Sequence, residues 1–489
     1  MKQRDVFSLL WAIPGIIGLC LITFMVIRAA TPSVPSANLV ADLSNAIGGT
    51  ADALIAPMPS GFDLEGNAVL LSEEVTDGNI SESGEALTDL GRVVVGKMLA
   101  SNAWYLMCAV FVLLGIPGIG LLIAAKTWGE MTWNGMLRVG GVAGISLCAF
   151  FIYGYGLIFS GVGLGGGFFA AGNDPVEFDL NGITEITDCL FLGACVAFVG
   201  AVWMGFSAGP IRGRALLCFI FFPVTLLLPL LLNWKWGGGW LDTSQWTNYD
   251  FGGAALLHLP LGAGALIIGV GARCFRKGHL RKESLVEEGL DDTIRPGAAI
   301  AGYALYILAV AAFPLGGTLE ATPEITAPVF QAVVVAGIIG FFCFGLWSLI
   351  LTQRDLSDWA SLGAVAGIIS ITGAADSVYW PHVIGASLLA GFILPPVIWV
   401  FDKWITRDPL ATAVVHGGGA IIGCSLPMFF SDLSTPLGQL MLVAVSALPV
   451  MVLFLIVLIL VGFIGFFFSD RGENESEGGS WTARPHARD

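Results

Sequence analysis

The chain has 489 residues, of which 56% are hydrophobic and only 12% are charged. Soluble proteins carry about 25% charged residues, so the composition excludes a soluble protein and indicates a chain that crosses a membrane many times. The formal net charge is −15, and no basic patch suited to a nucleic acid stands outside the apolar segments.

The apolar runs predict an all-α polytopic membrane protein. A helix needs about 20 apolar residues to cross a bilayer, and uninterrupted runs of this length do not fit the strands of a barrel. We expect twelve spans, near residues 6–27, 99–125, 139–161, 187–208, 215–233, 251–272, 297–316, 327–351, 359–374, 383–401, 409–430 and 438–468. The chain then divides into an N-terminal transmembrane helix or signal segment (1–30), an acidic extracytoplasmic segment (31–98), a membrane domain (99–469) and a short polar cytoplasmic tail (470–489).

The first span has two interpretations. Its apolar stretch of about 22 residues is longer than the core of a typical signal peptide, which favours a retained transmembrane helix. Cleavage after Ala29 and Ala30 would instead leave eleven spans. The orientation of the remaining helices is the same in both cases.

The basic residues predict the orientation of the chain. With the N-terminus inside, 18 of the 22 Lys and Arg residues fall on the cytoplasmic side. Between residues 31 and 91 there are ten acidic residues and no basic one, as expected for a segment outside the membrane. The sequence therefore predicts a multi-pass protein of the plasma (inner) membrane with a cytoplasmic C-terminus.

Catalytic and metal chemistry find no support in the sequence. The nine cysteines lie mostly in apolar runs without a C-x-x-C pair, so neither a disulfide framework nor a zinc site is indicated. No set of nucleophile, base and orienting group is recognisable, and we expect neither an enzyme nor a cofactor.

One motif occurs twice. "DFGGAALLH" (Asp250 to His258) and "DPLATAVVH" (Asp408 to His416) both place an aspartate eight residues before a histidine. The stretches continue as "GALIIG" and "GAIIG", and they open the fifth and tenth helices of the eleven-helix core. The motif therefore indicates an internal repeat of five helices.

An odd number of helices per repeat requires the second copy to run through the membrane upside down. This is the inverted five-plus-five plan of many transporters, in which the working site lies near the midplane between the halves. Equal spacing places His258 and His416 at equal depth, about 12 Å from the aspartates, and a pseudo-two-fold axis would bring the rings face to face. Ionisable residues at such depth usually mark a pathway, although a packed histidine without function is the alternative.

The two aspartates, Asp250 and Asp408, stand at helix starts. There a carboxylate can accept hydrogen bonds from free backbone N–H groups and match the positive end of the helix dipole. We expect this structural role at the site, with a role in shaping the substrate path as the alternative.

These motifs resemble the ammonium transporter, methylammonium permease and Rhesus glycoprotein family, of which the chain looks like a divergent member. Further landmarks occur in order: "IPGIGLL" (116–122), "FLGAC" (191–195), "WGGG" (236–239) and "FPLGG" (313–317). The resemblance covers roughly residues 99–469.

The resemblance implies a homotrimer with one pore per subunit and ammonium or ammonia as substrate. His258 and His416 would line the pore, Trp236 would be the tryptophan of the outer vestibule, and Phe191 would be the outer gate. Phe313, in the sixth-helix landmark, would also line the path.

Several positions depart from the family pattern. An inner gate phenylalanine is replaced by Cys195, a serine of the ammonium site by Gly317 or Gly316, a tryptophan by Val310 or Ala309, a tyrosine by Ile123, and an aspartate by Ala411. The tail does not match the family's segment for binding a nitrogen regulator, although the basic loop 273–295 could dock a cytoplasmic regulatory protein.

Three functions follow from these departures. The first is conduction of ammonium as ammonia through a hydrophobic pore, with deprotonation near the entrance, because dehydrating the ion costs many kcal/mol whereas neutral ammonia passes. The second is a channel for a neutral gas or small uncharged solute, and the third is a non-conducting ammonium sensor. A tryptophan at the mouth would attract a cation by about 1–2 kcal/mol.

Overall fold

The computed structural model describes residues 80–126, 129–159, 183–207, 220–242, 247–275, 296–351, 354–405, 408, 410–430 and 434–463. The predicted first span at 6–27, the basic loop between 276 and 295 and the tail 470–489 lie outside the described residues.

All eleven core spans expected from the sequence are helical, so the predicted all-α fold class is confirmed. The helices are α4 (Ile80–Lys126); α5, η1 and α6 (Gly129–Ala149, Phe150–Gly154 and Tyr155–Phe159); α7 (Glu185–Ser207); η2 and α9 (Pro223–Leu227 and Leu228–Lys235); η3 and α10 (Ala254–His258 and Leu259–Phe275); α11 (Pro296–Gly316); α12 (Pro323–Trp347); α13 (Leu356–Thr372); α14 (Trp380–Trp404); η4, α15 and η5 (Ala413–Gly418, Gly419–Ser425 and Leu426–Phe429); and α16 (Pro436–Phe463). Within the described ranges, eight are long and apolar enough to cross a membrane and three are shorter apolar helices.

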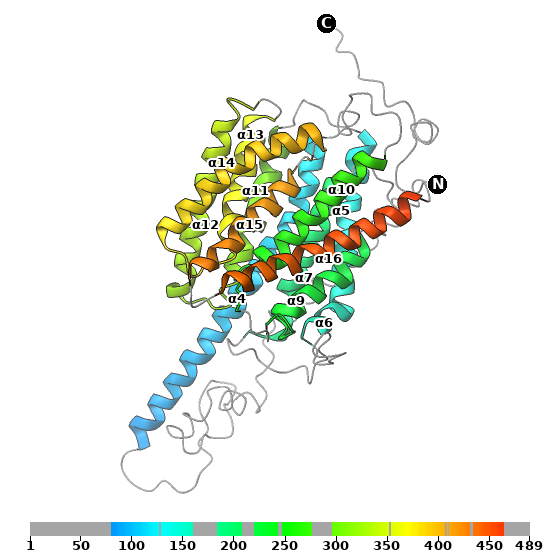
Figure 1. The fold of residues 1–489 in the computed structure, drawn as a ribbon. Coiled ribbons are helices and arrows are strands. Elements are labelled where there is room, and N and C mark those ends of the chain that lie inside the picture. Colours follow the sequence, from blue (N-terminus) through cyan, green and yellow to red (C-terminus); the bar gives the residue numbers. More distant parts are fainter. Residues whose placement is uncertain are drawn as a thin grey trace.

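The first core helix is longer than its membrane span. The span predicted near 99–125 matches the apolar window Gly96–Ala125, whereas α4 itself begins at Ile80 and includes the end of the acidic segment. In Figure 1 this first part of α4 projects from the bundle. The apolar window thus marks the membrane-spanning part of α4 but not the start of the helix.

The helices differ in how much protein surrounds them. The apolar window of α7 is 89% buried inside the protein, whereas that of α16 is only 28% buried. Helix α16 runs obliquely across one face of the bundle (Figure 1). Since a membrane helix can be apolar all round, sequence alone does not separate a central helix from a peripheral one.

Equivalent helices of the two halves pack against each other. The first helices, α4 and α11, are in contact, and so are the fifth helices, in the form of α10 and η4. Small residues allow this close approach: a Cβ at Gly115 of α4 would lie 2.5 Å from the Cβ of Ala309 in α11. Such pairing of equivalent helices is expected where they lie beside a two-fold axis that relates the halves.

Candidate functional site

The two aspartates hold the backbone at the start of η3 and η4. The Asp250 carboxylate accepts N–H groups of Ala255 at 3.0 Å and Leu256 at 2.9 Å. Asp408 accepts the N–H of Leu410 at 2.9 Å and also that of Thr412. Each carboxylate thus serves donors that have no partner inside the helix.

The backbone repeats the same irregular path after each aspartate. The third residue after Asp250 is Gly253, with φ of 81°, and the third residue after Asp408 is Ala411, with φ of 47°. A π-helical turn follows in both cases and contains the histidine. Since a side chain disfavours positive φ, Ala411 adopts a conformation that suits glycine better.

The two histidines meet at the centre of the bundle. Nδ1 of His258 lies 3.0 Å from Nδ1 of His416, and both residues are fully buried. The ring centroids are 5.1 Å apart, with an interplanar angle of 38°. The arrangement is therefore a hydrogen-bonded pair contributed by the same position of the two repeats.

A glycine contact sets the distance between the histidine-bearing segments. A Cβ at Gly262 of α10 would lie 2.2 Å from the backbone N of Gly417, the residue after His416. Only hydrogen atoms fit between the two backbones at this crossing. The contact holds the two repeats at the separation that the histidine hydrogen bond needs.

We expect Gly262→Leu to force these segments apart and to lower the free energy of unfolding by about 3 kcal/mol or more. Thermal unfolding of the purified protein in detergent measures the effect. The matched control is Gly385→Leu, because a Cβ at Gly385 meets nothing within 4 Å. Equal midpoints for the two variants would contradict the close crossing.

Burial raises the pKa of Asp250 to about 7, although its hydrogen bonds from Leu256 and Ala255 and the charge of Lys235 oppose the shift. The folded protein therefore binds this proton more tightly than the unfolded chain, for which the pKa is 3.8. The contribution of Asp250 to the free energy of unfolding therefore falls as pH rises from about 4 to about 7, and it is constant above that range.

We expect Asp250→Asn, which keeps a cap oxygen, to flatten the decline of the unfolding midpoint between pH 5 and 7. The measurement is a set of melts in detergent across pH 4 to 8. Asp242→Asn is the control, because Asp242 forms an exposed pair with Lys235. Parallel pH curves for wild type and Asp250→Asn would show that the buried carboxyl does not titrate in this window.

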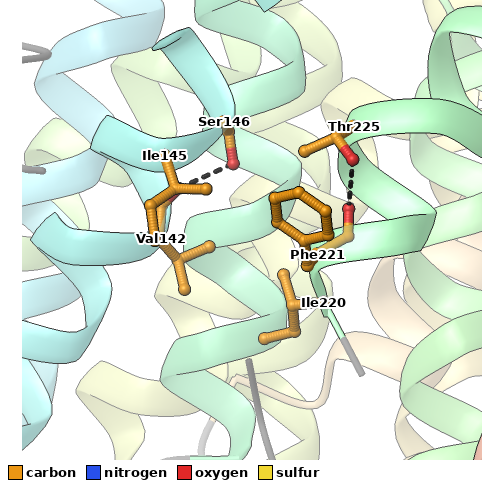
Figure 2. Close-up of a pocket in the computed structure, with 6 residues that line it drawn as sticks. All are labelled: Val142, Ile145, Ser146, Ile220, Phe221 and Thr225. Carbon is orange, nitrogen blue, oxygen red and sulfur yellow. Dashed lines mark hydrogen bonds between the residues drawn. The ribbon is translucent and has the colours of Figure 1, made fainter. Parts of the chain in front are cut away.

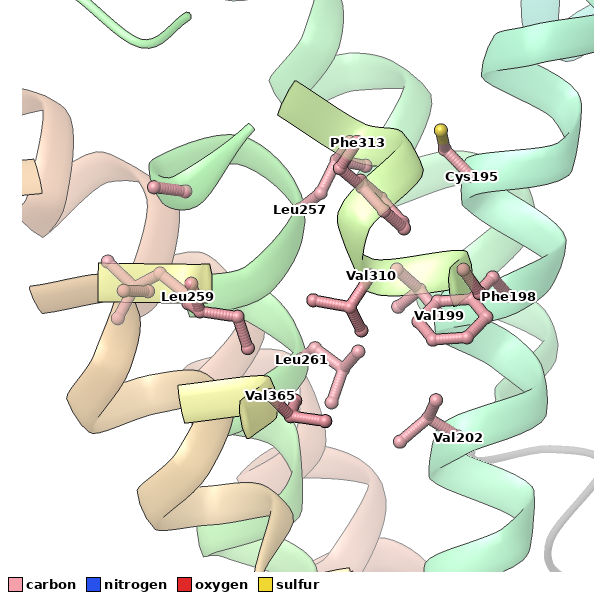
Figure 3. Packing of buried hydrophobic residues seen from close by; sticks show 14 of the residues in the cluster. Cys195, Phe198, Val199, Val202, Leu257, Leu259, Leu261, Val310, Phe313 and Val365 are labelled. Atoms are coloured by element: carbon pink, nitrogen blue, oxygen red, sulfur yellow. The ribbon is translucent and has the colours of Figure 1, made fainter. Parts of the chain in front are cut away.

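Apolar and aromatic side chains surround the pair. The ring of Phe313 lies 4.7 Å from that of His258. Phe198 contacts Phe313 edge-on at 5.5 Å. Figure 3 shows Phe313 and Val310 of α11 facing Cys195 and Phe198 of α7. A solute at this depth therefore meets few polar groups besides the histidines.

Trp236 lies next to the start of η3. It is half-buried, and its Nε1 donates a hydrogen bond of 3.2 Å to the carbonyl oxygen of Asp250. A Cβ at Gly253 would approach its ring to 3.2 Å. We call this part of the bundle, where α9 ends and η3 begins, the Trp236 end; the charge distribution predicts that it faces outside.

The family serine is replaced by Gly316 or Gly317. At Gly316, the ring of Phe191 occupies the space that a serine side chain would need. A Cβ at Gly316 would lie 2.2 Å from Cζ of Phe191, so no larger residue fits there. At Gly317 a Cβ would approach the carbonyl oxygen of Phe251 to 2.8 Å. Cys195, one turn after Phe191, is fully buried.

Two residues of this region, Tyr306 and Asp188, were not expected from the sequence. The hydroxyl of Tyr306, on α11, lies 2.5 Å from Nε2 of His416. Near Phe191, Asp188 accepts hydrogen bonds from Tyr105 at 2.9 Å and Tyr155 at 3.1 Å. Each is a polar residue inside an apolar helix, which is a sequence signal that it has a specific role. The sequence does not indicate their hydrogen-bond partners, because these lie on other helices.

A hollow between α5 and the segment before α9 is separate from these residues. It is lined by Val142, Ile145, Ser146, Ile220, Phe221 and Thr225. Figure 2 shows that the hydroxyls of Ser146 and Thr225 bond to carbonyls of their own helices, each at 2.7 Å. Both hydroxyl protons are therefore engaged with the backbone. The described ranges contain no group of three or more potential metal ligands.

Comparison with known proteins agrees with this architecture. Residues 103–474 match the model of the Ammonium Transporter Family. An ammonium transporter of Corynebacterium glutamicum is 26% identical over 69% of this chain and 74% of its own length. One of Bacillus subtilis is 25% identical over 78% of this chain and 95% of its own.

Solved structures share the fold. Mep2 of Candida albicans superposes with a TM-score of 0.62 at 18% identity, over 78% of this chain and 90% of Mep2. A structure described as a sensor Amt protein gives a TM-score of 0.61 at 19% identity, over 76% of this chain and 93% of that protein.

Proposed function

Because this chain belongs to the ammonium transporter family, we propose that it conducts ammonium as ammonia through a pore lined by His258 and His416. The observation that carries the proposal is the contact of 3.0 Å between the two imidazoles. Two ionisable rings, both fully buried, form one site where the halves of an inverted repeat meet. We infer a membrane transport protein, as the names of the relatives suggest, rather than an enzyme.

The surroundings of the pair favour a neutral solute. Transfer of an isolated ammonium-sized cation from water into a medium of low dielectric constant costs many kcal/mol. Ammonia is neutral and needs only a hydrogen bond, which an imidazole nitrogen can supply. Deprotonation near the entrance, before the level of Phe313, therefore makes passage feasible.

The Trp236 end offers two features that attract a cation. The half-exposed ring of Trp236 can hold a cation against its face. The carboxylate of Asp188 lies one turn before Phe191 and is linked to it by Tyr105, whose ring centroid is 4.4 Å from that of Phe191. We infer that these groups gather ammonium in place of the absent serine.

We expect Asp188→Asn to raise the ammonium concentration for half-maximal flux about threefold to tenfold, with little change in maximal flux, because it removes charge at the mouth. The effect should shrink at high salt, where exposed charges are screened. The measurement is initial flux against ammonium concentration at two salt concentrations. An unchanged half-maximal concentration would show that Asp188 serves only to hold the tyrosines.

Two other functions fit particular observations. The absent hydroxyl at Gly316 and Gly317 would suit a channel for a neutral gas or small uncharged solute. The likeness of fold to a structure described as a sensor Amt protein would suit a non-conducting sensor. Binding of ammonium without flux would identify the sensor.

Assembly and location belong to the same proposal. We infer a homotrimer in the plasma (inner) membrane with a cytoplasmic C-terminus and a possible cytoplasmic regulatory partner. The distribution of Lys and Arg supports the orientation, and the trimer is an expectation from the family resemblance. Mass measurement of the detergent-extracted protein tests the trimer.

The test of function is flux in liposomes that contain the full chain. Internal pH and membrane current are followed after a pulse of ammonium, and light scattering follows uptake of neutral solutes. We expect a saturating response to ammonium above that of protein-free liposomes. Neutral-solute flux without an ammonium response, or ammonium binding without any flux, would replace the proposal by the channel or the sensor.

A further inference from the structure

Tyr306 extends the histidine pair into a chain of three hydrogen-bonding side chains. Its hydroxyl oxygen lies 2.5 Å from Nε2 of His416, whose Nδ1 lies 3.0 Å from Nδ1 of His258. All three residues are fully buried. Phe198 stacks on the Tyr306 ring with a centroid distance of 5.7 Å, which holds the phenol in place.

The last atom of this hydrogen-bonded series has no partner among the described residues. Among the described residues, Nε2 of His258 is buried and makes no hydrogen bond. The ring of Phe313 lies against this histidine. This nitrogen is therefore the atom of the chain that can offer a hydrogen bond to a solute in the path.

A neutral imidazole carries one proton, so the direction of one hydrogen bond sets that of the next. If Tyr306 donates to Nε2 of His416, His416 donates through Nδ1 to His258, and His258 carries its proton on Nε2. If His416 donates to Tyr306 instead, His258 donates through Nδ1, and its Nε2 presents a lone pair.

The two directions leave different groups unsatisfied. In the first direction, the hydroxyl proton of Tyr306 and the ring proton of His416 are both in hydrogen bonds, and only the proton on Nε2 of His258 is not. In the second, the hydroxyl proton of Tyr306 is buried without an acceptor, because His416 is its only hydrogen-bond contact among the described residues. Each direction thus leaves one buried donor without an acceptor, but the second also leaves the basic lone pair on Nε2 of His258 without a donor among these residues. This additional unsatisfied group favours the first direction by about tenfold.

We propose, resting on the proposed function, that Tyr306 is a positioning residue that keeps the proton on Nε2 of His258 and so makes this atom a donor to the lone pair of ammonia. Ammonium has no lone pair and cannot accept this hydrogen bond. The histidine pair then recognises ammonia and rejects the ion, and the proton of ammonium must leave before the substrate reaches His258.

The tautomers can be measured directly on the full chain in lipid nanodiscs by ¹⁵N NMR of labelled histidine, because nitrogen shifts distinguish protonated from bare ring nitrogens. The protein has five histidines, and the signals that disappear in the double variant His258→Ala/His416→Ala belong to the pair. In the wild type we expect protonated Nε2 on His258 and protonated Nδ1 on His416, in about tenfold excess.

In Tyr306→Phe the two directions become equivalent in their number of unsatisfied groups, so we expect both tautomers within about threefold of each other. The matched control is Tyr303→Phe. Tyr303 lies on the same helix, is equally buried, and donates to Asp358 at 2.8 Å. It should leave the tautomer signals as in the wild type.

Transport gives a second readout. We expect Tyr306→Phe to lose part of the preference for ammonia, seen as ammonium-ion current that the wild type and Tyr303→Phe show to a smaller degree. A wild type with the proton on Nδ1 of His258, or unchanged signals in Tyr306→Phe, would overturn the proposal. The NMR result does not need flux, so a non-conducting protein with the expected tautomers would refute only the proposed function.

Discussion

Replacing His258 and His416 together by alanine is expected to lower saturable, ammonium-dependent flux by about 100-fold or more. Both imidazoles are fully buried among apolar side chains, so ammonia at this depth would lose its hydrogen-bonding partners. A hydrogen bond in an apolar medium contributes about 4–6 kcal/mol relative to none, and each 1.4 kcal/mol corresponds to a factor of ten. Even part of that contribution accounts for the expected loss.

The measurement is initial flux in liposomes at equal protein content for the double variant and the wild type. His382→Ala is the matched control, because His382 lies at a helix start and contacts the ring of Phe430 at 5.0 Å, away from the pair. If the alanine variant does not fold, as judged by its unfolding midpoint, His258→Leu/His416→Leu takes its place, because leucine fills the space without supplying a hydrogen bond. Flux equal to wild type in a folded double variant would remove the pair from the transport path.

The second large effect concerns Arg354, which links three segments near the end of the bundle opposite Trp236. Its guanidinium bonds both oxygens of Asp402 at 2.9 and 3.0 Å and the carbonyl oxygen of Asp408 at 2.5 Å. The side chains of the ion pair are only 2% and 6% exposed. Arg354→Met should therefore lower the free energy of unfolding by about 3–5 kcal/mol, because the carboxylate of Asp402 would remain buried and unpaired.

Thermal unfolding in detergent measures this loss. Adding Asp402→Leu to Arg354→Met should recover much of the stability, since removing both charges relieves the unpaired carboxylate. Lys97→Met is the control: Lys97 pairs with Glu320 at 2.5 Å but is 54% exposed, and its loss should cost less than about 1 kcal/mol. Equal losses for Arg354→Met and Lys97→Met would contradict the effect of burial.

The comparison of sequence and structure shows which inferences depend on local signals. The eleven described spans and the equivalence of the Asp250 and Asp408 stretches follow from apolar runs and from a repeated spacing. Both signals lie within about 20 residues of chain, and a bilayer imposes helix on any such apolar run. The span expected near 99–125 corresponds to the apolar window Gly96–Ala125, and α4 begins before it at Ile80 because charged residues can continue a helix outside the membrane.

Some features of the site could not be read from the sequence. Ala411, where the family resemblance implied an aspartate, has a left-handed backbone, and an alanine gives no sequence signal for positive φ. Gly316 and Gly317 are recognisable as lacking a serine. Only the packing shows that the ring of Phe191 occupies the space at Gly316.

Hydropathy and residue spacing, which are properties of the chain, are enough to predict a helical membrane protein with an inverted repeat and one matched histidine in each half. The contact of Tyr306 with this pair, by contrast, depends on how the helices pack. Its partner His416 is 110 residues away, and the contact exists only because α11 and η4 bring the two side chains to the same depth. A hydrogen bond of 2.5 Å depends on helix position to a fraction of an ångström, which no local pattern of apolar residues specifies.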